Sequence, residues 1–274
     1  MTHLPSDMPR TPGETSDTPA KSSPGIAEKS SQGWRPWLDP KQRRRQMLAF
    51  ILPLVVFMVM TSIEPTRPPD GEPSGWFAYE AYPYLYAVKI GLTAAALAWS
   101  WPAIRGLASR VSLLSVAVGV IGVVLWVLLS QIETSSPALT WLLGERGTRS
   151  AYNPLEQISS RPAAWLFLAV RLVGLAVVVP LAEELCYRGF VMRFLTRADW
   201  WTVPLGQVSR MALLLGTAMP VLAHPERLAA LVWFSLVTWL MVKTGSFWNC
   251  VVAHGVTNLL LGVYVLVTGN WWLL

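Results

Sequence analysis

The chain has 274 residues, of which 53% are hydrophobic and only 14% are charged, and its mean hydropathy is +0.42. This composition excludes an ordinary soluble domain and predicts a polytopic membrane protein. The net charge of +6 does not indicate nucleic-acid binding, because much of the basic excess directly precedes the first apolar segment, at Lys41, Arg43, Arg44 and Arg45. A cluster in that position sets membrane topology and contacts lipid headgroups. We therefore expect the lipid bilayer as a partner and no nucleic acid.

Two regions differ sharply in composition. Residues 1–45 are rich in Pro, Ser, Thr, Gly and charge, and they are predicted to form a disordered basic cytoplasmic tail. The first apolar stretch begins only at Met47, so we interpret it as a retained anchor and not as a cleaved signal peptide. Residues 46–274 are predicted to form a multi-helix transmembrane domain.

The expected fold is all-α, with about seven to eight transmembrane helices. A window of about 20 residues for one helical crossing selects seven segments, residues 46–63, 83–101, 111–132, 163–182, 203–222, 228–242 and 247–267. Pro204 and Pro220 bracket the fifth segment, where a broken or re-entrant helix is expected.

Basic residues between these segments predict the orientation. Lys and Arg favour cytoplasmic connections, which places the N-terminus there together with Arg105 and Arg197. The long connections at residues 64–82 and 133–161 then face the exterior. Residues 189–202 mix bulky apolar and basic side chains, a pattern typical of a helix lying in the membrane interface.

A charged hexad, Glu-Glu-Leu-Cys-Tyr-Arg at residues 183–188, directly follows an apolar run. Charges inside a bilayer are costly and are usually paired or functional. In a helix, Glu184 and Arg188 lie one turn apart and can form an ion pair, whereas Glu183 points about 100° away. The two carboxylates then have different environments, which suits Glu183 to general acid or base chemistry. Alternatively, the charges only mark the end of a crossing.

Two histidines fall in the apolar C-terminal third. His224 ends the fifth predicted segment, and His254 stands four residues before Asn258 on one helix face of the seventh. A single membrane histidine is usually a hydrogen-bonded packing residue. Two of them downstream of a Glu-Glu-Arg unit favour a functional cluster.

These three motifs, in this order and in a membrane context, resemble the CPBP family, which contains the CAAX proteases and bacteriocin-processing enzymes. The resemblance covers residues 163–267 as the catalytic core. It implies an intramembrane endopeptidase, a peptide hydrolase of the CAAX protease type, in which Glu184 and Arg188 support the site. It also implies an integral protein of a bacterial inner membrane whose substrate is a membrane-anchored polypeptide.

The resemblance further implies a role for each of four residues. Glu183 activates the attacking water, His224 assists it, and His254 with Asn258 stabilises the oxyanion. This division agrees with amide hydrolysis, which needs a base for water and donors for the carbonyl oxygen. One position departs from the family pattern, because Pro220 stands where the second motif usually has Phe.

No cofactor is certain from the sequence. We expect water activation without an obligatory metal, and if a divalent ion such as zinc is bound, its candidate ligands are Glu183, His224 and His254. The zincin motif His-Glu-x-x-His is absent from the chain.

Residues 82–89 additionally resemble an exosortase-associated branch of the family. This likeness implies a protein-sorting system as partner and makes prenylated substrates unexpected. The alternative function is a non-proteolytic membrane protein, either a transporter or an immunity or scaffold factor using the same Glu, Arg and His cluster. Lys89 and Arg171, which are charged residues within predicted crossings, support that alternative.

Overall fold

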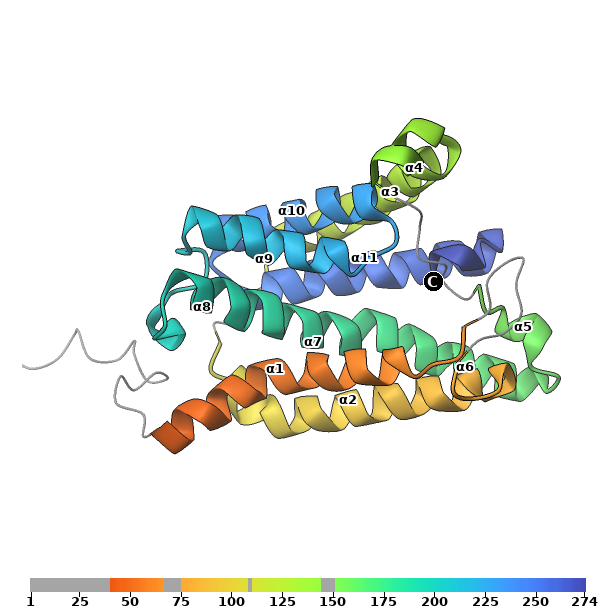
Figure 1. Ribbon diagram of the computed structural model, residues 1–274, viewed down its shortest axis with the longest axis horizontal. Helices are drawn as coiled ribbons and strands as arrows, with labels where there is room; N and C mark the ends of the chain where they lie inside the picture. Colours follow the sequence, from red (N-terminus) through yellow and green to blue (C-terminus); the bar gives the residue numbers. More distant parts are fainter. Residues whose placement is uncertain (1–39, 67–74, 108–109, 144–150) are drawn as a thin grey trace, which may run out of the picture. The chain divides into compact units, whose positions relative to one another are not determined.

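The computed structural model describes residues 40–66, 75–107, 110–143 and 151–274, and its regular elements there are all helical (Figure 1). Six helices of this part are long and apolar enough to cross a membrane, and a seventh apolar helix is shorter. The all-α membrane fold is therefore confirmed, with a helix number close to the expected one. All of these helices belong to one unit, Arg35–Leu274.

The first two crossings form a pair of helices packed side by side. They are α1 (Pro40–Ser62) and α2 (Tyr82–Ile104), the latter preceded by the 3₁₀ turn η1 (Tyr79–Ala81). Helix α1 begins at Pro40, so the basic cluster, which was predicted to belong to the tail, forms the first turns of the helix. The predicted disorder of residues 1–39 lies outside the described residues.

One long helix occupies the middle of the fold, between the α1–α2 pair and the C-terminal helices (Figure 1). It runs over Arg161–Thr196, and its 36 residues span about 54 Å at 1.5 Å per residue. Its parts are α6 (Arg161–Val173), the π-helix η2 (Gly174–Val178), α7 (Val179–Glu184), the π-helix η3 (Leu185–Val191) and α8 (Met192–Thr196). The charged hexad therefore lies between and within two π-helical turns, which are often found at functional sites.

The separate interfacial helix predicted at residues 189–202 is wrong. Residues up to Thr196 continue the central helix, and only the short 3₁₀ turn η4 (Trp200–Thr202) follows. The reason is Arg193, which is buried and donates hydrogen bonds to the carbonyl oxygens of Gly189, Trp201 and Val203. These bonds satisfy the charge within the protein and fold the connection back against the helix end.

The remaining helices are α3 (Leu113–Ser135), α4 (Pro137–Leu143), α5 (Pro154–Gln157), α9 (Arg210–Leu222), α10 (Arg227–Thr244) and α11 (Phe247–Thr268), with the 3₁₀ turn η5 (Trp271–Leu273). Most of them lie on the other side of the central helix, but the short α5 packs against α6. Gly245 and Gly269 end α10 and α11 in the left-handed conformation, with φ of 59° and 73°. Glycine adopts this conformation without steric cost, so both helices stop cleanly.

Helix α9 is shorter than the crossing predicted at residues 203–222. Its 13 residues span about 20 Å, less than the hydrocarbon core of about 30 Å. The first part of the prediction is wrong because Pro204 and Gly206, the latter with a φ of 87°, prevent a helix there. Helix α9 ends at Leu222, before it could cross the membrane. His224, two residues later, lines a cavity inside the protein.

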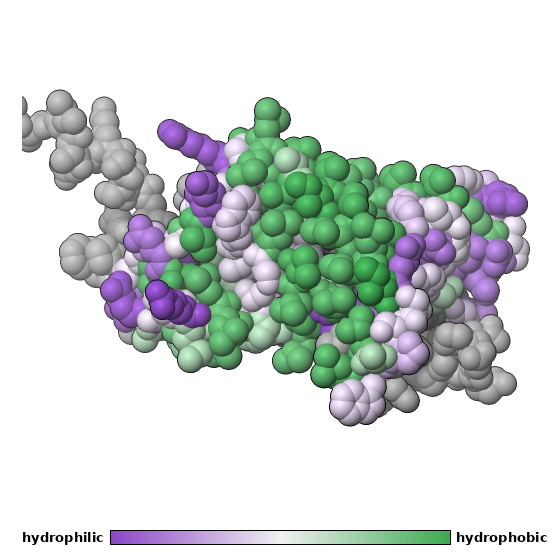
Figure 2. Space-filling model, turned by 90° about the horizontal axis from the view of Figure 1, so that it is seen from above, coloured by the Kyte–Doolittle hydropathy of each residue, from purple (hydrophilic) through white to green (hydrophobic). Residues whose placement is uncertain are grey.

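A band of apolar side chains covers the surface between two polar ends (Figure 2). Exposed side chains of this kind include Val59 of α1, Val120 and Leu128 of α3, and Val263 of α11. A water-facing surface would not present such a band, whereas lipid tails solvate it. The protein is thus an integral membrane protein.

Candidate active site

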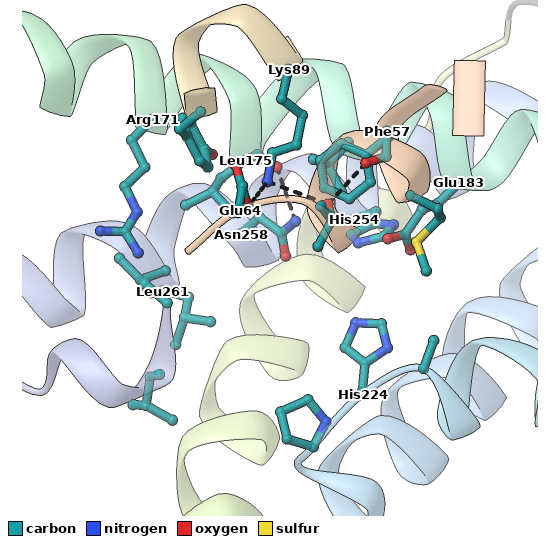
Figure 3. Close-up of a pocket in the computed structure, with 18 of the residues that line it drawn as sticks. Phe57, Glu64, Lys89, Arg171, Leu175, Glu183, His224, His254, Asn258 and Leu261 are labelled. Carbon is teal, nitrogen blue, oxygen red and sulfur yellow. Dashed lines mark hydrogen bonds and ion pairs between the residues drawn. The ribbon is translucent and has the colours of Figure 1, made fainter. Parts of the chain in front are cut away.

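Glu183 and Glu184 occupy different environments, although they are adjacent. Glu184 has no exposed surface. Its Oε1 accepts one hydrogen bond from Arg188 Nη1 and one from His254 Nδ1, each at 2.9 Å. The expected one-turn ion pair is therefore present. Glu183 points instead into a cavity of about 370 Å³ (Figure 3). One carboxylate is occupied by structural partners, and the other faces the space where a substrate can enter.

Arg188 joins the central helix to its neighbours. It is fully buried, and its Nη2 donates to Phe234 O at 3.3 Å and to Thr238 Oγ1 at 3.5 Å, both on α10. The Thr238 hydroxyl in turn lies 2.9 Å from that of Thr217 on α9. The Glu184–Arg188 pair thus links the central helix to α10 and, through Thr238, to α9.

His254 and Asn258 share one face of α11 and both line the cavity. Since the carboxylate of Glu184 accepts at Nδ1 of His254, that nitrogen carries a proton and Nε2 is left for a ligand. Asn258 Nδ2 donates to Leu175 O at 2.9 Å, in the π-helix η2. Each side chain is oriented by the central helix and keeps a polar group for the cavity.

His224 lies on another wall of the same cavity (Figure 3). Its Nδ1 donates to the carbonyl oxygen of Pro220 at 2.7 Å, which leaves Nε2 as the second nitrogen. The ring stands between Trp126 and Phe234, with centroids 5.7 and 5.1 Å away. Helix α9 continues through Pro220 to Leu222, so the proline does not turn the histidine out of the site.

Sequence reasoning missed Glu133, which holds the segment after His224. Glu133 is buried at the end of α3, and its two carboxylate oxygens accept from the backbone N–H groups of Arg227 and Leu228, each at 3.2 Å. A carboxylate at a helix N-terminus satisfies free N–H groups and interacts favourably with the helix dipole. Glu133 therefore fixes where α10 begins.

Replacing Glu133 by Ala is expected to lower the free energy of unfolding by about 1–3 kcal/mol, because two partly buried N–H groups lose their acceptor. Thermal unfolding of the detergent-solubilised protein measures the loss. Glu156→Ala, which changes an exposed carboxylate on α5, is the matched control and should leave the melting temperature unchanged. Equal melting temperatures for both variants would contradict this capping role.

A second polar cluster lines the other end of the cavity, and the site prediction did not include it. Lys89 Nζ and Glu64 Oε2 form a buried ion pair at 2.7 Å, and the ammonium group lies over the rings of Phe57 and Tyr86 at 4.7 and 4.6 Å. Burial raises the pKa of Glu64 above its ordinary value, although nearby Lys89 acts against this shift. The charge of Lys89 within a crossing was the only sequence signal for this cluster.

The candidate metal ligands Glu183, His224 and His254 all line the cavity. Within the described part of the chain, no group of three or more His, Cys, Asp or Glu side chains is placed to hold a metal ion. His254 Nδ1 bonds Glu184, and His224 Nδ1 bonds the carbonyl oxygen of Pro220. Water activation without an obligatory metal therefore stays a prediction.

This fold and cavity define an integral membrane protein with a polar, enzyme-like site inside its helices. Residues 164–260, about a third of the chain, match the family model described as Rce1-like, type II CAAX prenyl endopeptidase Rce1-like. The chain therefore carries a domain of the Rce1-like CAAX prenyl endopeptidase family, which is a family of peptide hydrolases acting on proteins. Both glutamates of the hexad, Arg188, both histidines and Asn258 lie within the match. No curated protein and no solved structure matches the chain.

Proposed function

We propose that the protein is an intramembrane endopeptidase that hydrolyses a peptide bond of a membrane-tethered protein. The observation that carries this proposal is the contrast between the two adjacent carboxylates. Glu184 is held by Arg188 and His254, while Glu183 faces a cavity that His224, His254 and Asn258 also line. A base beside potential oxyanion donors in a water-poor space is what amide hydrolysis requires.

In the proposed reaction, the carboxylate of Glu183 removes a proton from water as the water oxygen bonds to the carbonyl carbon. His224 Nε2 accepts a second hydrogen bond from this water and orients it. When the C–N bond breaks, the carboxylic acid of Glu183 returns the proton to the leaving amine. Each proton and electron pair is thus accounted for by side chains of the cavity.

The oxyanion of the tetrahedral intermediate is stabilised by α11. Glu184 accepts a hydrogen bond from Nδ1 of His254 and orients the ring, so that a proton carried on Nε2 is directed at the oxyanion. The second N–H of Asn258 supplies another donor, since the first is used by Leu175 O. Glu184, Arg188 and Leu175 act only by positioning these groups.

The proposal extends to the substrate and the setting. A cavity enclosed by apolar helices favours a polypeptide that is already anchored in the bilayer. We propose a bacterial inner membrane as the location, with the N-terminus in the cytoplasm, because the basic residues cluster at the start of α1. The likeness of residues 82–89 to the exosortase-associated branch supports a protein-sorting partner, and three of these residues, Tyr82, Tyr86 and Lys89, line the cavity.

The test compares membrane fractions of host cells expressing wild type or Glu183→Ala at equal levels, by mass spectrometry of new peptide termini. We expect at least one membrane protein to accumulate uncut in the variant, which would also identify the substrate. Identical termini in both samples, with both proteins folded and equally abundant, would favour the alternative of a transporter or of an immunity or scaffold factor.

A further inference from the structure

The end of the cavity near Arg171 carries more cationic than anionic side chains. Arg171 is 3% exposed, and its Nη1 donates to the backbone oxygen of Tyr152 at 3.0 Å. Within the described residues it forms no ion pair with a carboxylate, since Glu64 is paired with Lys89. The side chains of Arg171, Lys89 and Glu64 therefore bring two positive charges and one negative charge to this cavity, which Leu274 also lines.

A buried unpaired charge is expensive, and an intramembrane charge usually marks a functional site. Arg171 is not needed for the proposed reaction, because it lies far from Glu183. The two residues are twelve positions apart on the central helix, which corresponds to about 18 Å along its axis. They lie at opposite ends of the cavity, with Asn258 and Glu64 between them (Figure 3).

The walls between these two ends suit an extended peptide. Tyr82 and Tyr86 of α2 and Leu261 of α11 line this stretch and offer apolar contact to side chains. Glu64 Oε1 is buried without a hydrogen-bond partner, and it can accept a backbone N–H of an incoming chain. An extended peptide covers about 18 Å with roughly five residues at 3.3 Å each.

We propose that Arg171 binds a carboxylate of the substrate peptide, about five residues from the bond that is cut. This inference rests on the proposed function and adds a specificity-determining residue to it. The carboxylate is supplied either by the C-terminus of the substrate or by an acidic side chain. Arg is suited to this role because its planar guanidinium group can donate two parallel hydrogen bonds to a carboxylate.

The test measures binding without cleavage, using purified protein that carries Glu183→Gln. The probe is a fluorescently labelled apolar heptapeptide in three forms: the free acid, the C-terminal amide, and an amide whose last residue is Glu. Fluorescence anisotropy in detergent micelles gives each dissociation constant. We expect at least one carboxylate form to bind about 10- to 100-fold more tightly than the plain amide, as for a charged hydrogen bond. Tighter binding of the free acid would show that the C-terminus supplies the carboxylate, and tighter binding of the Glu-ended amide would show that a side chain supplies it.

Adding Arg171→Gln should remove this preference and leave the binding of the plain amide unchanged. Arg161→Gln, which changes an exposed arginine at the start of α6, is the matched control and should keep the preference. Equal binding of all three peptides, no binding of any, or a preference that survives Arg171→Gln would overturn the proposal. The comparison of acid with amide is made without any change at Arg171. It therefore still tests the carboxylate preference if the Arg171→Gln protein fails to fold.

The two proposals can fail separately. If the acid preference is absent while Glu183-dependent cleavage is observed in cells, the carboxylate subsite is wrong and the protease function stands. If the preference is present but no cleavage depends on Glu183, the cavity binds carboxylate-bearing peptides without hydrolysing them.

Discussion

Glu183→Gln is expected to lower the rate of peptide-bond hydrolysis by about 10²- to 10⁴-fold, the usual contribution of a general base. An amide cannot take a proton from water, but it has nearly the shape of the carboxylate. Because Glu183 faces the cavity, its replacement should leave the melting temperature unchanged or slightly raised. The measurement is the turnover of a substrate found in the proteomic comparison, made with purified protein.

The adjacent variant, Glu184→Gln, is the informative comparison. It removes the carboxylate that Arg188 and His254 share, and leaves a fully buried guanidinium group without its counterion. We expect a loss of about 3–5 kcal/mol in the free energy of unfolding, as for other broken buried pairs. If Glu183→Gln destabilised the protein and Glu184→Gln did not, the assigned roles of the two carboxylates would be reversed.

Gly255→Ala is expected to lower both stability and activity, although the added group is a single methyl. A Cβ at this position would lie 2.5 Å from the backbone oxygen of Ala176, so α11 and the central helix must move apart. Two hydrogen bonds on either side of this contact, His254 to Glu184 and Asn258 to Leu175, would lengthen. We expect a loss of about 1–3 kcal/mol in stability and about 100-fold in hydrolysis.

Gly91→Ala is the control for this prediction, because a Cβ at Gly91 of α2 meets no atom within 4 Å. Alanine is the better helix former, so this variant should be as stable as wild type or more stable by up to about 1 kcal/mol. Thermal unfolding and turnover are measured for both variants. A fully active Gly255→Ala protein would show that the close approach of the two helices is not what positions His254 and Asn258.

The hexad illustrates how far the sequence alone could predict the site. The spacing of Glu184 and Arg188 predicted their ion pair, because contacts one helical turn apart follow from helix geometry. The contact of Glu184 with His254 joins residues seventy positions apart, and no local pattern encodes it. The catalytic role of Glu183 remains a prediction from the resemblance, now supported by its place in the cavity.

The predictions that failed did so where tertiary contacts override composition. Residues 189–196 look amphipathic in sequence, but the burial of Arg193 by backbone carbonyls extends the central helix through them. Glu64 does lie in the connection after α1, but no local pattern could place it beside Lys89, twenty-five residues away. The short α9, in contrast, could have been predicted from Pro204 and Gly206.

The end of the cavity opposite Glu183 is built from two parts of the chain. Lys89 and Glu64 come from the segment ahead of the matched residues, whereas Arg171 lies within them, as do Glu183, His254 and Asn258. Mutations in the first two helices can therefore change which polypeptides are accepted while the hydrolytic groups stay intact. Such an arrangement allows a lineage to acquire new substrates by altering its N-terminal half alone.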